Sequence, residues 1–126
     1  MRQISKKLRQ LVFDKYGGRC AYCGQELGKN KNRMWNVDHI HPKRLSHWLR
    51  NFDMNSIDNL NPSCRRCNIF KGGMQLELFR SELQKQVFRL RKNPQFKRAL
   101  DYGQITIHES PINFYYEKLQ SKEYKK

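Results

Sequence analysis

The sequence predicts a small mixed α+β protein, and three features of its 126 residues support this class. Apolar residues recur at helical spacing towards both ends, a short central segment alternates like a β-strand, and four cysteines form two Cys-x-x-Cys pairs. The mean hydropathy of -0.96 places much of the chain near solvent, so a bound metal would help to stabilise a modest core. We expect one domain over residues 1–126, with an N-terminal helix in 1–19, a core in 20–73 and a helical C-terminal extension in 74–126 that ends in a short extended tail.

The N-terminal part is predicted to contain a helix, a turn and a strand. Apolar residues recur every three or four positions from Ile4 to Tyr16, and the Gly17-Gly18 pair ends this helix. Cys20-Ala-Tyr-Cys-Gly24 has the composition of a tight metal-binding turn, and residues 25–33 are expected to form a polar loop. A short strand over 34–37 then leads into Asp38-His39.

The C-terminal part is predicted to be mainly helical. A short helix begins at Cys64 and is closed by Gly72-Gly73. A longer one covers 76–90, and Asn93-Pro94 begins another that runs through Leu100. Two short strands or extended segments are expected at 105–107 and 112–116, where isoleucine and aromatic residues gather.

The four cysteines predict a structural zinc site. Cys20 and Cys23 form one pair, and Cys64 and Cys67 form the other. Four soft thiolates suit a closed, tetrahedral Zn²⁺ site that adds folding free energy. A redox pair and two disulfides are the alternatives, but this spacing favours metal in a reducing interior. We therefore expect an intracellular, cytoplasmic protein.

The charge balance predicts a polyanionic partner. The formal net charge is +15, and residues 1–74 hold 15 Lys and Arg against 5 Asp and Glu. Nucleic acid is the commonest partner of such a chain, although a merely soluble basic protein would have the same composition. No apolar run approaches the roughly 18 residues that span a bilayer, and no secretory signal is visible. The sequence therefore argues against membrane and secreted classes.

Residues around Asp38 have the chemistry that phosphodiester hydrolysis needs. A histidine can take a proton from the attacking water, and a divalent ion can stabilise the leaving oxygen. Hard ions such as Mg²⁺ prefer oxygen ligands and use few protein groups, which the Asp38 carboxylate and the Asn68 amide oxygen could supply. Adjacent strand residues point to opposite faces, so His39 and Asp38 could serve water and metal separately.

These motifs resemble the HNH endonuclease family, whose signature is an Asp-His dipeptide, a central Asn and a final His or Asn before a Lys. Asp38-His39, Asn59, Asn68 and Lys71 stand in that order. The resemblance is closest to zinc-bearing members, where two Cys-x-x-Cys pairs bracket the motif, and the region also looks like the HNH domain of RNA-guided CRISPR nucleases. It implies a ββα-metal core flanked by helices.

The resemblance also implies a role for each residue. His39 would be the general base, Asp38 and Asn68 would hold the catalytic ion, and Asn59 would brace the loop and orient the base. Asn68 stands where other members have His, and an amide favours Mg²⁺ or Mn²⁺ over softer ions. The implied activity is one-metal hydrolysis of double-stranded DNA that leaves a 5′-phosphate and a 3′-hydroxyl.

Four further residues are candidates for phosphate contact. Arg65, Arg66 and Lys71 are expected on the short helix, and His41 follows the Asp-His dipeptide; a solvated surface is the alternative for each. Two other functions stay open for the whole chain. It could be a non-catalytic, zinc-dependent nucleic-acid-binding module, or a phage packaging accessory protein that acts with a larger phage or host protein.

Overall fold

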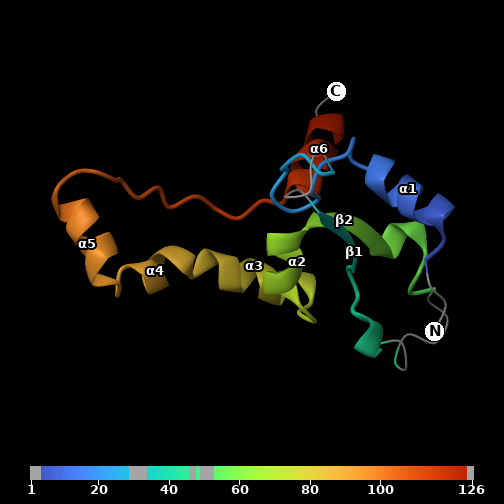
Figure 1. The fold of residues 1–126 in the computed structure, drawn as a ribbon, viewed down its shortest axis with the longest axis horizontal. Coiled ribbons are helices and arrows are strands. Elements are labelled where there is room, and N and C mark those ends of the chain that lie inside the picture. Colours follow the sequence, from blue (N-terminus) through green and yellow to red (C-terminus); the bar gives the residue numbers. More distant parts are fainter. Residues whose placement is uncertain (1–3, 29–33, 46–47, 49–52, 125–126) are drawn as a thin grey trace. The chain divides into compact units, whose positions relative to one another are not determined.

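The computed structural model describes residues 4–28, 34–45, 48 and 53–124. Residues 29–33 of the predicted loop therefore lie outside the described part of the chain. The elements follow in the order α1 (Lys6–Asp14), β1 (Trp35–His39), the 3₁₀ turns η1 (Lys43–Leu45) and η2 (Ile57–Asn59), β2 (Leu60–Cys64), α2 (Arg65–Lys71), α3 (Leu76–Gln84), α4 (Gln86–Leu90), α5 (Pro94–Asp101) and α6 (Tyr115–Tyr124) (Figure 1). The prediction of a mixed α+β fold is confirmed.

The chain divides into two compact units. The first consists of Met1–Leu76 together with Asn113–Lys126, and the second is Glu77–Ile112. The first unit contains both strands and all four cysteines, and the second is built from helices and the segment that follows them. The expectation of a single domain over residues 1–126 stays a prediction.

An antiparallel strand pair followed by a helix forms the centre of the first unit (Figure 1). In the register of β1 and β2, Asp38 pairs with Asn61 and His39 pairs with Leu60. Every residue of β2 is buried, and α2 begins directly after it. The strand expected at 34–37 instead covers Trp35–His39, and the predicted ββα arrangement is confirmed.

Helix α1 buries Val12, and two basic side chains, one in α1 and one just past it, contact the strand pair and η2. The Arg9 guanidinium stacks 4.0 Å from the centre of the Trp35 ring and donates to the Trp35 carbonyl at 3.2 Å. Just past α1, the Lys15 ammonium donates to the carbonyls of Ile57 and Leu60, both at 2.8 Å. Burial lowers the pKa of Lys15, and the nearby Asp58 carboxylate partly opposes this shift. These two basic groups thus link the α1 region to β1, η2 and β2.

The predicted end of the first helix is confirmed by the backbone. Gly17 and Gly18 adopt φ values of 67° and 78°, which glycine reaches without steric cost. The Gly18 amide donates to the Phe13 carbonyl at 3.0 Å and satisfies one of the last helical acceptors. The chain then turns into the segment that carries Cys20 and Cys23.

The cysteine turn is held from two sides. The Ala21 amide donates to the Pro62 carbonyl of β2 at 2.8 Å, and the Tyr115 amide donates to the Tyr22 carbonyl at 3.1 Å. The second contact lies at the start of α6, in the segment predicted to be a strand or extended over 112–116. That prediction is wrong from Tyr115 onwards, because a helix begins there. The first amides of this helix donate hydrogen bonds to carbonyls of the cysteine turn.

The second unit has regular helices but little buried surface. The helix predicted over 76–90 is interrupted at Lys85, whose amide reaches back only three residues to Glu82. The helix predicted from Asn93-Pro94 is confirmed, with the Asn93 side chain accepting from the Gln95 amide at 2.9 Å. No strand forms at 105–107, a fully described stretch that lacks regular structure.

None of the helices in the described part of the chain combines the length and the apolar character that crossing a bilayer requires.

Candidate metal centre and active site

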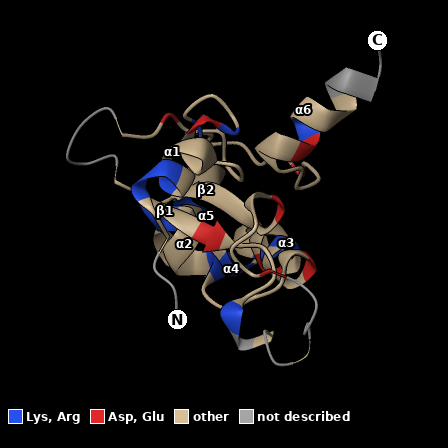
Figure 2. Cartoon of the chain, turned by 90° about the vertical axis from the view of Figure 1, so that its right-hand side faces the viewer, with Lys and Arg blue, Asp and Glu red and all other residues tan. Residues whose placement is uncertain are grey.

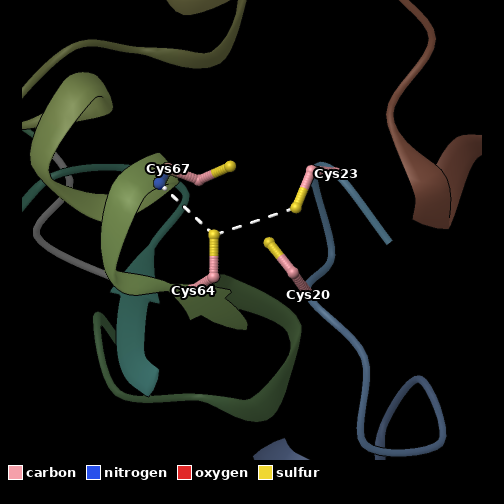
Figure 3. Close-up of side chains that lie close together, drawn as sticks. All are labelled: Cys20, Cys23, Cys64 and Cys67. Atoms are coloured by element: carbon pink, nitrogen blue, oxygen red, sulfur yellow. Dashed lines mark hydrogen bonds between the residues drawn. The ribbon is translucent and has the colours of Figure 1, made fainter. Parts of the chain in front are cut away.

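The four cysteine sulfurs meet at one point in the first unit (Figure 3). Cys20 and Cys23 come from the turn after α1, Cys64 ends β2 and Cys67 lies in the first turn of α2. Their Sγ atoms all lie within 4.8 Å of one another, and those of Cys23 and Cys64 are 3.8 Å apart. Tetrahedral Zn–S bonds of about 2.3 Å place neighbouring sulfurs about 3.8 Å apart. The cluster therefore fits the predicted structural zinc.

The sulfurs of the cluster lie close enough together to shift one another's pKa values. Thiol groups of Cys23 and Cys67 donate to the Cys20 sulfur and lower its pKa to about 2. The same contacts raise the pKa of Cys67, and donation to Cys20 raises the pKa of Cys23 to about 11. All four are free cysteines. Zinc binding would displace the remaining thiol protons, because cysteine binds metal as the thiolate.

Asp38 lies at the buried end of a small polar network. It is 5% exposed, and the Tyr22 hydroxyl donates a hydrogen bond to its Oδ2. The Lys71 ammonium lies 3.3 Å from both carboxylate oxygens and donates to the His39 carbonyl at 3.1 Å. Burial raises the pKa of Asp38, while the Lys71 charge and the Tyr22 hydrogen bond oppose this shift.

A single cleft brings together three of the predicted site residues. Asp38, His39 and Asn68 line it together with Val37, Pro42, Lys43, Gly72 and Gly73, and its volume is about 310 Å³. Asp38 and His39 come from the end of β1, and Asn68 lies one residue beyond Cys67 on α2. The carboxylate, the imidazole and the amide are donors suited to an oxygen-ligated divalent cation and a nearby base.

The imidazole of His39 has a neighbour that the sequence analysis did not single out. Its Nε2 lies 2.9 Å from the Asn55 Oδ1. With the amide in this orientation Nε2 carries the hydrogen, which leaves Nδ1 able to accept a proton. Asn55 is in turn fixed by its backbone amide, which donates to the Asp53 carboxylate at 3.0 Å.

Asn59 is buried and holds the loop that follows β1. Its Oδ1 accepts from the His41 amide at 2.8 Å, and its Nδ2 donates to the Met54 carbonyl at 2.8 Å. Asn59 is 1% exposed and ties the two ends of the loop between His41 and η2. This geometry has the bracing character that the resemblance implies, and a catalytic part for Asn59 stays a prediction.

The residues predicted to contact phosphate occupy different environments. Arg65 and Arg66 are exposed at the start of α2, with the Arg66 guanidinium donating to the Gln25 side chain at 3.1 Å. His41 is also exposed. Lys71, however, has a fully buried side chain that is paired with Asp38. Its phosphate contact stays a prediction, and it would have to leave Asp38 to make that contact.

Residues 20–73 match the model of the family described as HNH endonuclease. This segment is an HNH endonuclease family domain. The match begins at Cys20 and ends at Gly73, so it includes both cysteine pairs and the whole cleft. No curated protein and no solved structure matches the chain significantly. Membership in this family suggests nuclease activity and a nucleic-acid substrate.

Two residues of the HNH domain were missed by sequence reasoning, namely Tyr22 and Asn55. Tyr22 lies between two cysteines, where only the metal-binding spacing drew attention, and nothing local indicates that its hydroxyl reaches Asp38. Asn55 stands in an Asp-x-Asn string that is typical of a turn. Only the fold, which brings the loop back to β1, reveals its contact with His39.

Proposed function

We propose that the chain is a metal-dependent HNH endonuclease that hydrolyses DNA phosphodiester bonds, with His39 as the general base. The observation that carries this proposal is the cleft shared by Asp38, His39 and Asn68 within the family-matched segment. The net charge of +15 supports a polyanionic substrate. The whole chain would then act as one nuclease domain.

His39 would activate the attacking water. An imidazole can accept a proton near neutral pH, and the contact between Nε2 and Asn55 supports Nδ1 as the accepting atom. Asn59 would keep the loop in place so that the ring faces the cleft. The base would thus be oriented by two asparagines that precede β2 in the sequence.

Asp38 and Asn68 would hold the catalytic cation. A bound Mg²⁺ or Mn²⁺ supplies Lewis-acid stabilisation of charge on the phosphate and the leaving oxygen. An Asp carboxylate and an Asn amide oxygen are hard ligands that leave room for water and phosphate. The structural zinc would be held separately by Cys20, Cys23, Cys64 and Cys67.

Exposed basic groups would position the DNA. Arg65 and Arg66 at the start of α2, and His41 beyond the end of β1, are proposed to contact phosphates that flank the scissile bond. Basic residues also occur along α1, part of which is blue in Figure 2. Phosphate contacts release counterions, so binding should weaken steeply as salt is raised.

The test is cleavage of supercoiled plasmid by the zinc-loaded protein with Mg²⁺, Mn²⁺ or EDTA. The wild type should cut with either divalent ion and not with EDTA. His39→Ala should lower the rate by about 100-fold or more, because general-base catalysis contributes on that scale. DNA affinity and bound zinc should be retained.

His108→Ala is the matched control, since this exposed histidine belongs to the second unit and does not line the cleft. Its cleavage rate should equal that of the wild type. Equal cleavage by His39→Ala would overturn the general-base assignment. Tight DNA binding by the wild type without any divalent-dependent cleavage would instead favour the non-catalytic binding module.

A further inference from the structure

Tyr22 is a buried side chain placed between two of the zinc-site cysteines. It is 4% exposed, and its ring packs edge-on against Phe114 at a centroid distance of 5.2 Å. Its hydroxyl donates to the Asp38 carboxylate and accepts from the Asn61 amide at 3.4 Å. One residue of the cysteine turn therefore reaches the carboxylate proposed to hold the catalytic cation.

The direction of the Tyr22 side chain is fixed by the turn itself. Cys20 and Cys23, two and one residues away, direct their sulfurs into the cluster (Figure 3). The Tyr22 carbonyl accepts from the Tyr115 amide, and the neighbouring Ala21 amide donates to β2. We therefore expect a change in the cysteine turn to move the ring, and with it the hydroxyl that donates to Asp38.

Asp38 is held from a second direction by Lys71. In the described part of the chain, the side-chain partners of Asp38 are the Tyr22 hydroxyl and the Lys71 ammonium. An ionised carboxylate has about four acceptor positions. These two donors leave acceptor capacity on Asp38, and the residue also lines the cleft with His39 and Asn68.

We infer that Tyr22 is a positioning residue that couples the zinc site to the catalytic cation site by orienting the Asp38 carboxylate. This inference rests on the proposed function, because it takes Asp38 as a ligand of the catalytic cation. Loss of the hydroxyl would leave Oδ2 with the Lys71 ammonium as its side-chain partner and let the carboxylate turn away from the cleft. Partners that orient a metal ligand typically contribute about 10- to 100-fold in metal affinity.

The experiment is an Mn²⁺ titration of the zinc-loaded full chain, followed by the electron paramagnetic resonance signal of free Mn²⁺. Tyr22→Phe keeps the ring and its packing on Phe114 but removes the hydroxyl. Its Mn²⁺ dissociation constant should rise by about 10-fold or more, with zinc content unchanged. Tyr16→Phe is the matched control, because Tyr16 belongs to the same aromatic cluster through Tyr116. Its affinity should equal that of the wild type.

Unchanged Mn²⁺ affinity in a zinc-loaded Tyr22→Phe protein would overturn the inference, as would the lack of Mn²⁺ binding by the wild type. A wild type that binds Mn²⁺ in this Tyr22-dependent way but cuts no DNA would overturn the proposed function and leave the coupling standing. The two failures are therefore distinguishable.

A second measurement covers the case in which Tyr22→Phe loses zinc. Tyr22→3-fluorotyrosine keeps the hydroxyl, and its ¹⁹F resonance should shift when Mg²⁺ is added to the zinc-loaded protein. The same label placed by Tyr16→3-fluorotyrosine should not shift. A resonance at position 22 that is insensitive to Mg²⁺ would contradict the coupling.

Discussion

The two units of the chain bury very different kinds of side chains. The buried polar and charged residues of the described chain all belong to the first unit; they are Asp38, Asn59, Asn61, Ser63 and Lys71. In residues 77–112, all of which the structure describes, Phe79 is the only buried side chain. The ion pairs of this second unit, such as Arg89 with Glu82, involve exposed or half-exposed groups.

This difference indicates that the first unit contributes most of the stability and contains the polar groups of the candidate site. Buried polar groups are tolerated only where each finds a partner, and no buried side-chain nitrogen or oxygen among the described residues is left unsatisfied. Exposed ion pairs add little stability. We therefore expect substitutions in the first unit to have large, cooperative effects and those in the second unit to have small, local ones.

The largest effect is expected from the zinc site. Cys64→Ser should lose zinc and unfold the first unit, because Cys64 also accepts the Cys67 amide at 3.4 Å and ends β2. Structural zinc contributes about 10 kcal/mol or more of apparent binding free energy. Bound zinc and near-ultraviolet circular dichroism measure the loss. Removing zinc from the wild type with a chelator and restoring it is the control, and a folded zinc-free protein would contradict this expectation.

The next effect is expected from the buried ion pair. Lys71→Met removes the ammonium and leaves the Asp38 carboxylate without its charged partner, which costs about 3–5 kcal/mol for a buried pair. Urea unfolding of zinc-loaded protein measures this loss. Lys97→Met is the control, since Lys97 is exposed on α5 and its replacement should cost less than about 0.5 kcal/mol. If the two variants had equal free energies of unfolding, the expected difference between the two units would be contradicted.

The smallest effect is expected from a helix cap in the second unit. Asn93→Ala removes the acceptor for the Gln95 and Phe96 amides, which costs about 1 kcal/mol. Hydrogen exchange should accelerate in α5 while the amides of β1 and β2 keep their protection. Gln95→Ala, which leaves the cap intact, should not accelerate exchange. Acceleration that spreads into the strands would show that the second unit supports the first.

The sequence was most informative where a local rule decides the structure. The helical spacing before Gly17-Gly18 and the Asn93-Pro94 cap depend on neighbouring residues alone, and both are confirmed. The cysteine spacing likewise predicted the cluster. It was least informative for β2, whose Leu-Asn-Pro-Ser-Cys sequence has no alternation, and for α6, where Tyr115 and Tyr116 look like strand residues.

The candidate site shows the same limit. The family order of Asp38, His39 and Asn68 indicated which residues would share a cleft, and the structure places them in one. The burial of Lys71 against Asp38 could not be read from a basic residue near the end of a short helix. The contacts of Tyr22 and Asn55 join segments 16 residues apart, so no local pattern records them.

Helix α2 has a consequence for how this chain can change. Its first turn supplies sulfur to the zinc site, and the next residues supply Asn68 to the cleft and Lys71 to Asp38. One residue inserted after Cys67 would rotate both side chains by about 100° around the helix axis. We therefore expect this helix to tolerate substitutions but not insertions or deletions. Transfer of the centre to another scaffold would require the whole segment Cys64–Lys71.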